Sequence, residues 1–144
     1  MAQKTCALDL GAVRVGVAVS DELGMFAHPR GVLDGRRRPE LLASLRDLVR
    51  AEDIRHVLVG LPLDMKGGEG DAARKARLLA QEIADATGAN VELVDERLST
   101  VQAQRALAAS EVRGKKARAH IDEASAVVLL QAWLDAKISG GYDP

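Results

Sequence analysis

The apolar residues change period near Pro39, and this change constrains the fold more than any other feature of the sequence. Before it, short β-branched and apolar runs at 5–10, 13–20 and 27–33 predict three strands. Their connections are short, and Gly11 lies in the first of them. Consecutive strands with such tight connections are typical of an antiparallel meander.

After Pro39, helical patterns alternate with short apolar runs. Helices are expected from about Glu40, over 71–87, from Ser99 and over 121–138, and buried strands over 57–61 and 91–94. A meander followed by βα units predicts an α/β fold with a mixed five-stranded sheet. The sheet would combine three antiparallel strands and two parallel strands, with helices on both faces. We expect one domain over 1–138 and a flexible tail over 139–144.

Composition excludes several classes of protein. The chain has 144 residues and three aromatic side chains, Phe26, Trp133 and Tyr142, so the core must be aliphatic. Few rings argue against binding unpaired bases by stacking. The single Cys6 excludes an internal disulfide and is expected to be buried and inert. With no signal peptide and no apolar run of about 18 residues, a cytoplasmic protein is expected.

Three acidic positions are candidates for chemistry. Asp9 lies inside an apolar strand, Asp95 and Glu96 follow the buried strand 91–94, and Asp122 is expected in the first turn of the last helix. Each has an ordinary explanation, as a turn residue, a solvated loop or a helix-dipole partner respectively. Strand alternation favours Glu96 over Asp95, with Asp95 held in reserve.

Together these acids predict a metal site, because ligands in such sheets lie beyond the carboxyl ends of the central strands. Asp9, Glu96 and Asp122 would supply hard oxygen ligands for Mg²⁺ or Mn²⁺. Two such ions can activate water and stabilise the leaving oxygen of a phosphodiester. Zinc is disfavoured, since there is one cysteine and the three histidines lack ligand spacing.

Four segments together resemble the YqgF/RuvX family. They are 9–21 (DLGAVRVGVAVSD), 60–62 (GLP) with the Gly67-Gly68 loop, 95–100 (DERLST) and 121–126 (IDEASA). The resemblance implies a ribonuclease H-like three-layer fold related to Holliday-junction resolvases, and a role in maturing the 5′ end of small-subunit ribosomal RNA. On this mapping Asp9, Glu96 and Asp122 are the metal-binding acids, and Glu123 or Asp95 is a candidate fourth acid.

Basic residues near these acids are candidates for contacting nucleic acid. Lys115, Lys116 and Arg118 lie in a basic stretch just before Asp122, where a phosphate backbone would need positive charge. Arg14 and Arg97 could each hold a phosphate or pair with a nearby aspartate. The loop 60–70 lacks the ending of a phosphate-binding P-loop, so a mobile loop over a substrate groove is expected.

The sequence therefore predicts a two-metal-ion endonuclease acting on structured nucleic acid, either branched DNA or precursor ribosomal RNA. One alternative is a phosphate- or nucleotide-binding domain related to actin-like and sugar-kinase ATPases. Another is a noncatalytic RNA- or ribosome-binding factor. The choice between DNA and RNA stays open, as do the choice between Mg²⁺ and Mn²⁺ and the oligomeric state. Symmetric cleavage of a four-way junction would require a homodimer.

Overall fold

A computed structural model describes residues 3–11, 13–98 and 115–138, with side chains omitted for Leu98 and 115–120. The strands are β1 (Lys4–Leu10), β2 (Arg14–Ser20), β3 (Ala27–Asp34), β4 (Ile54–Leu61) and β5 (Asn90–Asp95). The helices are α1 (Arg38–Ala51), α2 (Asp71–Thr87), the short 3₁₀ helix η1 (Glu96–Leu98) and α4 (Lys115–Ile138).

The five strands form one mixed sheet in the order β3-β2-β1-β4-β5. β1 pairs antiparallel with β2, and β2 pairs antiparallel with β3. β4 pairs parallel with both β1 and β5. The predicted combination of a meander and two parallel strands is confirmed.

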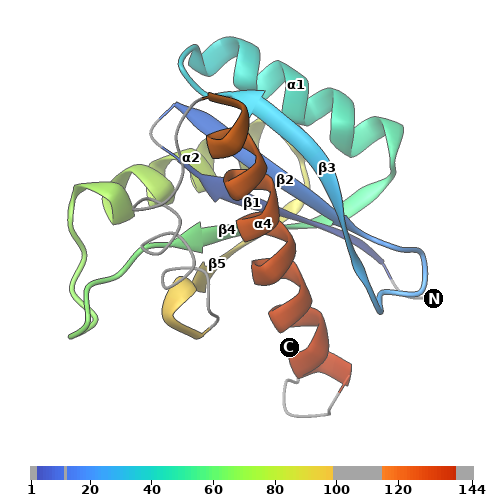
Figure 1. The fold of residues 1–144 in the computed structure, drawn as a ribbon. Helices are drawn as coiled ribbons and strands as arrows, with labels where there is room; N and C mark the ends of the chain where they lie inside the picture. Colours follow the sequence, from blue (N-terminus) through green and yellow to red (C-terminus); the bar gives the residue numbers. More distant parts are fainter. Residues whose placement is uncertain (1–2, 12, 99–114, 139–144) are drawn as a thin grey trace.

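Helices cover both faces of this sheet, so the molecule has three layers (Figure 1). α1 and α2 pack on one face through Leu41, Leu45 and Ile83, against Leu8 and Val59 of the sheet. On the other face, α4 packs Ala126, Leu129, Leu130, Trp133 and Leu134 against Ala7, Ala18 and Leu58. Small residues on this side of the sheet let α4 approach closely.

The closest approach of α4 to the sheet is at Gly16 in β2. A Cβ atom added to Gly16 would lie 2.0 Å from the carbonyl oxygen of Asp122. Because Gly16 has no side chain, α4 can lie this close to the sheet.

The last helix begins at Lys115, six residues before the predicted start at Ile121. Lysine, arginine and alanine are all good helix formers, so the basic stretch continues the helix instead of preceding it. Asp122 consequently lies about two turns into α4 and is not in its first turn. The helix expected from Ser99 and the tail 139–144 lie outside the described residues. In the part of the chain that is described, no helix combines the length and the apolar character needed to span a membrane.

Candidate functional site

Asp9 lies at the carboxyl end of β1 and is fully buried. Ala7, two residues earlier, belongs to the core beneath α4, so strand alternation turns Asp9 toward the same face. A buried carboxylate is costly unless charges or hydrogen bonds compensate it. Its position in the most central strand of the sheet makes Asp9 the best-fixed of the three acids.

Asp122 comes to the same place from α4. Its two carboxylate oxygens would lie 3.2 and 3.3 Å from a Cβ atom on Gly11, at the end of β1. Its backbone rests on Gly16, the residue that pairs with Asp9 between β1 and β2. Two aspartates that are 113 positions apart in the chain (122 minus 9) are thus brought to one end of the sheet.

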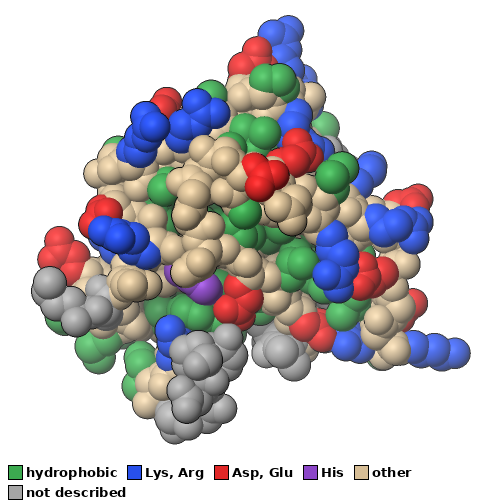
Figure 2. Space-filling view, turned by 180° about the vertical axis from the view of Figure 1, so that it is seen from behind, with side chains coloured by type: hydrophobic (Ala, Val, Ile, Leu, Met, Phe, Trp, Pro, Cys, Tyr) green, Lys and Arg blue, Asp and Glu red, His purple; other side chains and the backbone are tan. Residues whose placement is uncertain are grey.

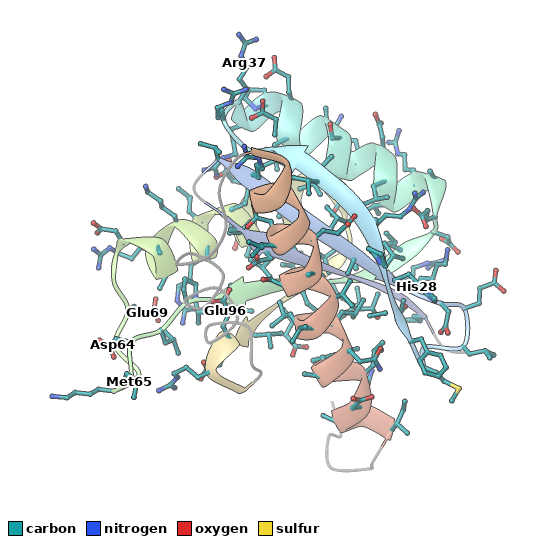
Figure 3. All side chains as sticks on the ribbon, in the orientation of Figure 1. His28, Arg37, Asp64, Met65, Glu69 and Glu96 are labelled. Carbon is teal, nitrogen blue, oxygen red and sulfur yellow. The ribbon has the colours of Figure 1, made fainter. Side chains whose placement is uncertain are left out.

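Glu96 reaches this end from η1, which directly follows β5. Its side chain is 1% exposed, and its Oε1 would lie 2.5 Å from a Cβ atom on Gly60. Gly60 lies next to Asp9 across the sheet, one position beyond the paired residues Leu8 and Val59. Figure 3 shows Glu96 near the ends of β4 and β5, on the side toward α4.

Burial and, as the smaller cause, the neighbouring negative charge of Asp95 together raise the pKa of Glu96 to about 7. Taking a carboxylate out of water disfavours its charged form, and a bound cation would reverse this effect. The charge of Glu96 therefore depends on what else occupies the site.

Asp95 is oriented differently from Glu96. Its carboxylate accepts hydrogen bonds from Arg97 Nε at 3.1 Å and Nη2 at 2.7 Å, and this pairing lowers its pKa. The strand ends at Asp95, and the 3₁₀ turn that follows redirects the chain so that Glu96 points inward. Glu123, the other candidate fourth acid, accepts a hydrogen bond from the backbone N–H of Gly31 in β3.

The three acids surround one end of the sheet without meeting at a single point. Across the described residues, no three His, Cys, Asp or Glu side chains stand close enough together to hold an ion. The donor set itself suits a hard cation, because it consists of carboxylates from three separate elements.

The loop between β4 and α2 is held in a defined shape. The carboxylate of Asp64 accepts hydrogen bonds from the backbone N–H groups of Lys66 (2.9 Å) and Gly68 (2.7 Å). Arg97 Nη1 lies 3.4 Å from the carbonyl oxygens of Asp64 and Met65. The mobility of this loop over a substrate groove stays a prediction. Its tip projects from the body of the molecule (Figure 3), and Met65 there is 95% exposed.

The predicted nucleic-acid-binding residues differ in their surroundings. Arg97 is paired with Asp95, as described above, while the structure shows no ion pair for Arg14 with another described residue. The backbone of Lys115, Lys116 and Arg118 forms the first turns of α4, and their side chains lie outside the description. On the face opposite the view of Figure 1, basic and acidic side chains alternate and form no single basic patch (Figure 2).

Sequence reasoning missed the glycines that shape this site. Gly11, Gly16 and Gly60 each leave the space that an acid or its backbone fills. Gly11 and Gly60 stand at the ends of β1 and β4, next to the acids, which is a signal that could have identified them. Gly16 gives no such signal, because its contact with α4 depends on the packing of a distant helix.

Comparison with solved structures identifies the fold. The structure of Thermus thermophilus RuvC in complex with a Holliday junction substrate superimposes with a TM-score of 0.57, at 16% sequence identity. The match covers 95% of this chain and 96% of that one. The protein has a ribonuclease H-like fold.

Sequence comparison identifies the family. The chain belongs to the RuvX family, described as Holliday junction resolvase, whose profile matches residues 3–136. A relative from Anaeromyxobacter sp. (strain Fw109-5), named "Putative pre-16S rRNA nuclease", is 43% identical over 90% of this chain and 95% of its own length. A protein of the same name from Streptomyces coelicolor is 44% identical over 96% of this chain and 83% of its own. The chain is thus a member of a nuclease family.

Proposed function

We propose that this protein is a metal-dependent endonuclease that hydrolyses phosphodiester bonds in structured nucleic acid through Asp9, Glu96 and Asp122. The observation that carries the proposal is the burial of Asp9 at the end of β1, with Glu96 of η1 and Asp122 of α4 packed against glycines at the same end of the sheet. Carboxylates gathered from distant segments repel one another unless a cation binds them or one of them takes up a proton. Family membership and the names of the relatives support the same conclusion.

The cation is Mg²⁺ or Mn²⁺ in this proposal, held by Asp9, Glu96 and Asp122. Two bound ions would activate a water molecule and stabilise the leaving oxygen. Asp9 provides a fixed anchor because the central strand holds it. Glu96 and Asp122 adjust their side chains as the site fills, and ionisation of Glu96 accompanies binding since its pKa is raised in the metal-free protein.

Cationic side chains orient the substrate. Arg14, Lys115, Lys116 and Arg118 contact backbone phosphates in this proposal. Arg97 contributes its charge while it supports the loop 62–70. With so few aromatic residues, the protein recognises the shape of a duplex or branch and does not stack unpaired bases.

The first experiment measures cleavage by the parent protein and by Asp9→Asn, with Mg²⁺, Mn²⁺ or a chelator. The substrates are a four-way DNA junction and a precursor of small-subunit ribosomal RNA, and solution mass is measured in parallel. We expect the substitution to lower the rate by at least about a hundredfold, as losses of catalytic electrostatic groups do. Cleavage that survives Asp9→Asn or the chelator would contradict the proposal.

A second variant, Gly60→Ala, tests the position of Glu96 specifically. The added methyl group occupies the space of the Glu96 carboxylate, whose flexible end can move away without unfolding the protein. We expect near-parent stability with strongly reduced cleavage. The control is Gly70→Ala, because no atom lies within 4 Å of a Cβ atom there. Equal activity of the two variants would show that Glu96 is not part of the active site.

Homodimerisation is part of the proposal for junction substrates alone. Two-fold symmetric cleavage needs two active sites. α4 buries one side against its own sheet, while Val127, Val128 and Pro29 of β3 line an apolar surface groove of about 550 Å³. The solution mass in the first experiment decides whether two copies associate, and this groove is the surface proposed to join them.

A further inference from the structure

A second pocket lies at the opposite end of the sheet from the acids. Its volume is about 420 Å³, and it is lined by the beginning of β1, by His56 of β4, by the turn at Gly24 and by α4 from Trp133 to Ile138. Trp133 is 11 residues beyond Asp122, which corresponds to about 16 Å along the helix axis. The pocket is therefore separate from the proposed nuclease site.

Glu92 of β5 contacts both ring side chains of this pocket, His56 and Trp133. Its Oε1 lies 3.2 Å from His56 Nε2, and its Oε2 accepts a hydrogen bond of 3.2 Å from Trp133 Nε1. The two rings are stacked, with their centroids 5.3 Å apart and an angle of 21° between their planes. Three elements, β4, β5 and α4, are thus joined by one carboxylate, and both rings are held before any ligand arrives.

The Trp133 ring in turn positions a positive charge. Lys137 Nζ lies 4.3 Å from the ring centroid, within the range of a cation–π interaction. Lys137 is one turn beyond Trp133 on α4, and both line the pocket. The side chain of an exposed lysine is usually mobile. The contact with the Trp133 ring therefore places the Lys137 ammonium group before a ligand binds.

The rest of the lining combines polar and apolar groups. Gln3 and Thr5 supply an amide and a hydroxyl group near the start of β1, and Leu134 and Ile138 form an apolar wall. Ile138 is 58% exposed, although it is a large aliphatic residue. An apolar wall beside fixed polar groups is typical of pockets that bind small organic molecules.

We propose that this pocket binds a small phosphate monoester of the nucleoside monophosphate class. Lys137 and His56 would hold the phosphate group, and the base would lie against Leu134 and Ile138. The volume exceeds what a bare phosphate needs and suits a single nucleotide. The two carboxylate oxygens of Glu92 are engaged with His56 Nε2 and Trp133 Nε1, and the Lys137 ammonium group supplies the positive charge that attracts the anion. A metal ion fits poorly, because Lys137 would repel it. This inference is independent of the proposed nuclease activity.

The test uses the single tryptophan of the chain as its reporter. Because Trp133 lines the pocket and no other tryptophan exists, a change in tryptophan fluorescence reports on this pocket. The full-length protein is titrated with a nucleoside monophosphate, the matching nucleoside, inorganic phosphate and a short 5′-phosphorylated oligonucleotide. We expect a saturable change with the monophosphate and about tenfold weaker binding of the nucleoside.

The variants are Lys137→Ala and His56→Gln, with Lys75→Ala on the exposed side of α2 as the matched control. Both pocket variants are expected to bind the monophosphate about tenfold more weakly, and the control to bind it as the parent does. Lys137 is exposed, so its replacement does not endanger folding. If the phosphorylated oligonucleotide binds more tightly than the monophosphate, the natural ligand is the end of a nucleic-acid strand. If the monophosphate binds more tightly, the natural ligand is a free nucleotide. The absence of any saturable change, or parent-like binding by Lys137→Ala, would overturn the proposal.

Discussion

Glu96 shows how the surroundings of one residue can set its charge. Its carboxylate is shielded from water by Gly60 and the end of β4, and Asp95 adds a like charge next to it. Asp95 itself stays ionised because the guanidinium of Arg97 lowers its pKa. The pKa values of these two adjacent acids are thus shifted in opposite directions. The difference arises because Glu96 points inward while Asp95 pairs with Arg97.

We expect the metal-free protein to lose stability between about pH 4.5 and pH 7 through Glu96. Its folded pKa of about 7 lies above the usual 4.5, so the folded state binds the proton more tightly. The stabilisation is complete below the unfolded pKa and is lost as the pH rises through the folded one. Glu96→Gln should remove this part of the pH dependence, on the order of 2 kcal/mol.

Urea unfolding at pH 5 and pH 8, with a chelator present, measures this effect. Glu22→Gln is the control, since Glu22 is exposed in the turn after β2. An identical pH dependence of the parent and of Glu96→Gln would show that burial does not raise the Glu96 pKa.

The packing of α4 on the sheet depends on one position in β2. The helix backbone at Asp122 and Glu123 rests on Gly16, and Glu123 also accepts a hydrogen bond from the Gly31 N–H in β3. Gln131, two turns later, accepts a hydrogen bond of 2.8 Å from the Ala27 N–H. α4 is therefore attached to β3 at two points, and it rests on β2 at the first of them.

We expect the substitution Gly16→Ala to displace α4 from the sheet. The added Cβ would lie 2.0 Å from a backbone oxygen, and backbone cannot move aside as a side-chain end can. We expect a loss of about 3 kcal/mol or more in the free energy of unfolding, together with loss of cleavage, because overpacking forces backbone shifts. Circular dichroism during urea unfolding provides the measurement, with Gly70→Ala as the control. A stability close to that of the parent would mean that α4 does not approach the sheet this closely.

The whole molecule has two cores, one on each face of a single sheet. The larger core, beneath α1 and α2, contains Cys6, Leu8, Val57 and Ile83. Burial raises the pKa of the Cys6 thiol to about 12, and the charge of Glu52 raises it in the same direction. The expectation of a buried, inert cysteine is consistent with both observations.

Cys6 therefore provides a probe of global unfolding. We expect a thiol reagent to leave Cys6 unmodified in the native protein and to modify it fully in denaturant, because the thiolate is the reactive form and core positions open only with the whole fold. Absorbance of the released thiol chromophore follows the reaction. Rapid stoichiometric labelling under native conditions would show that the β1 core opens locally.

The sequence by itself determined the order of the described strands and helices and the mixed sheet, and it singled out the three acids as candidates. Apolar periodicity is a local property, and strands such as 57–61 can be recognised without knowing their neighbours. It did not determine the start of α4, because a basic stretch is compatible with both a helix and a loop. Only the tertiary structure decided that Glu96 turns inward while Asp95 pairs with Arg97. It also decided that glycines on different strands make room for the acids, and that Glu92 joins His56 to Trp133. These contacts link residues far apart in the chain, and such distances are fixed by packing, which no local pattern encodes.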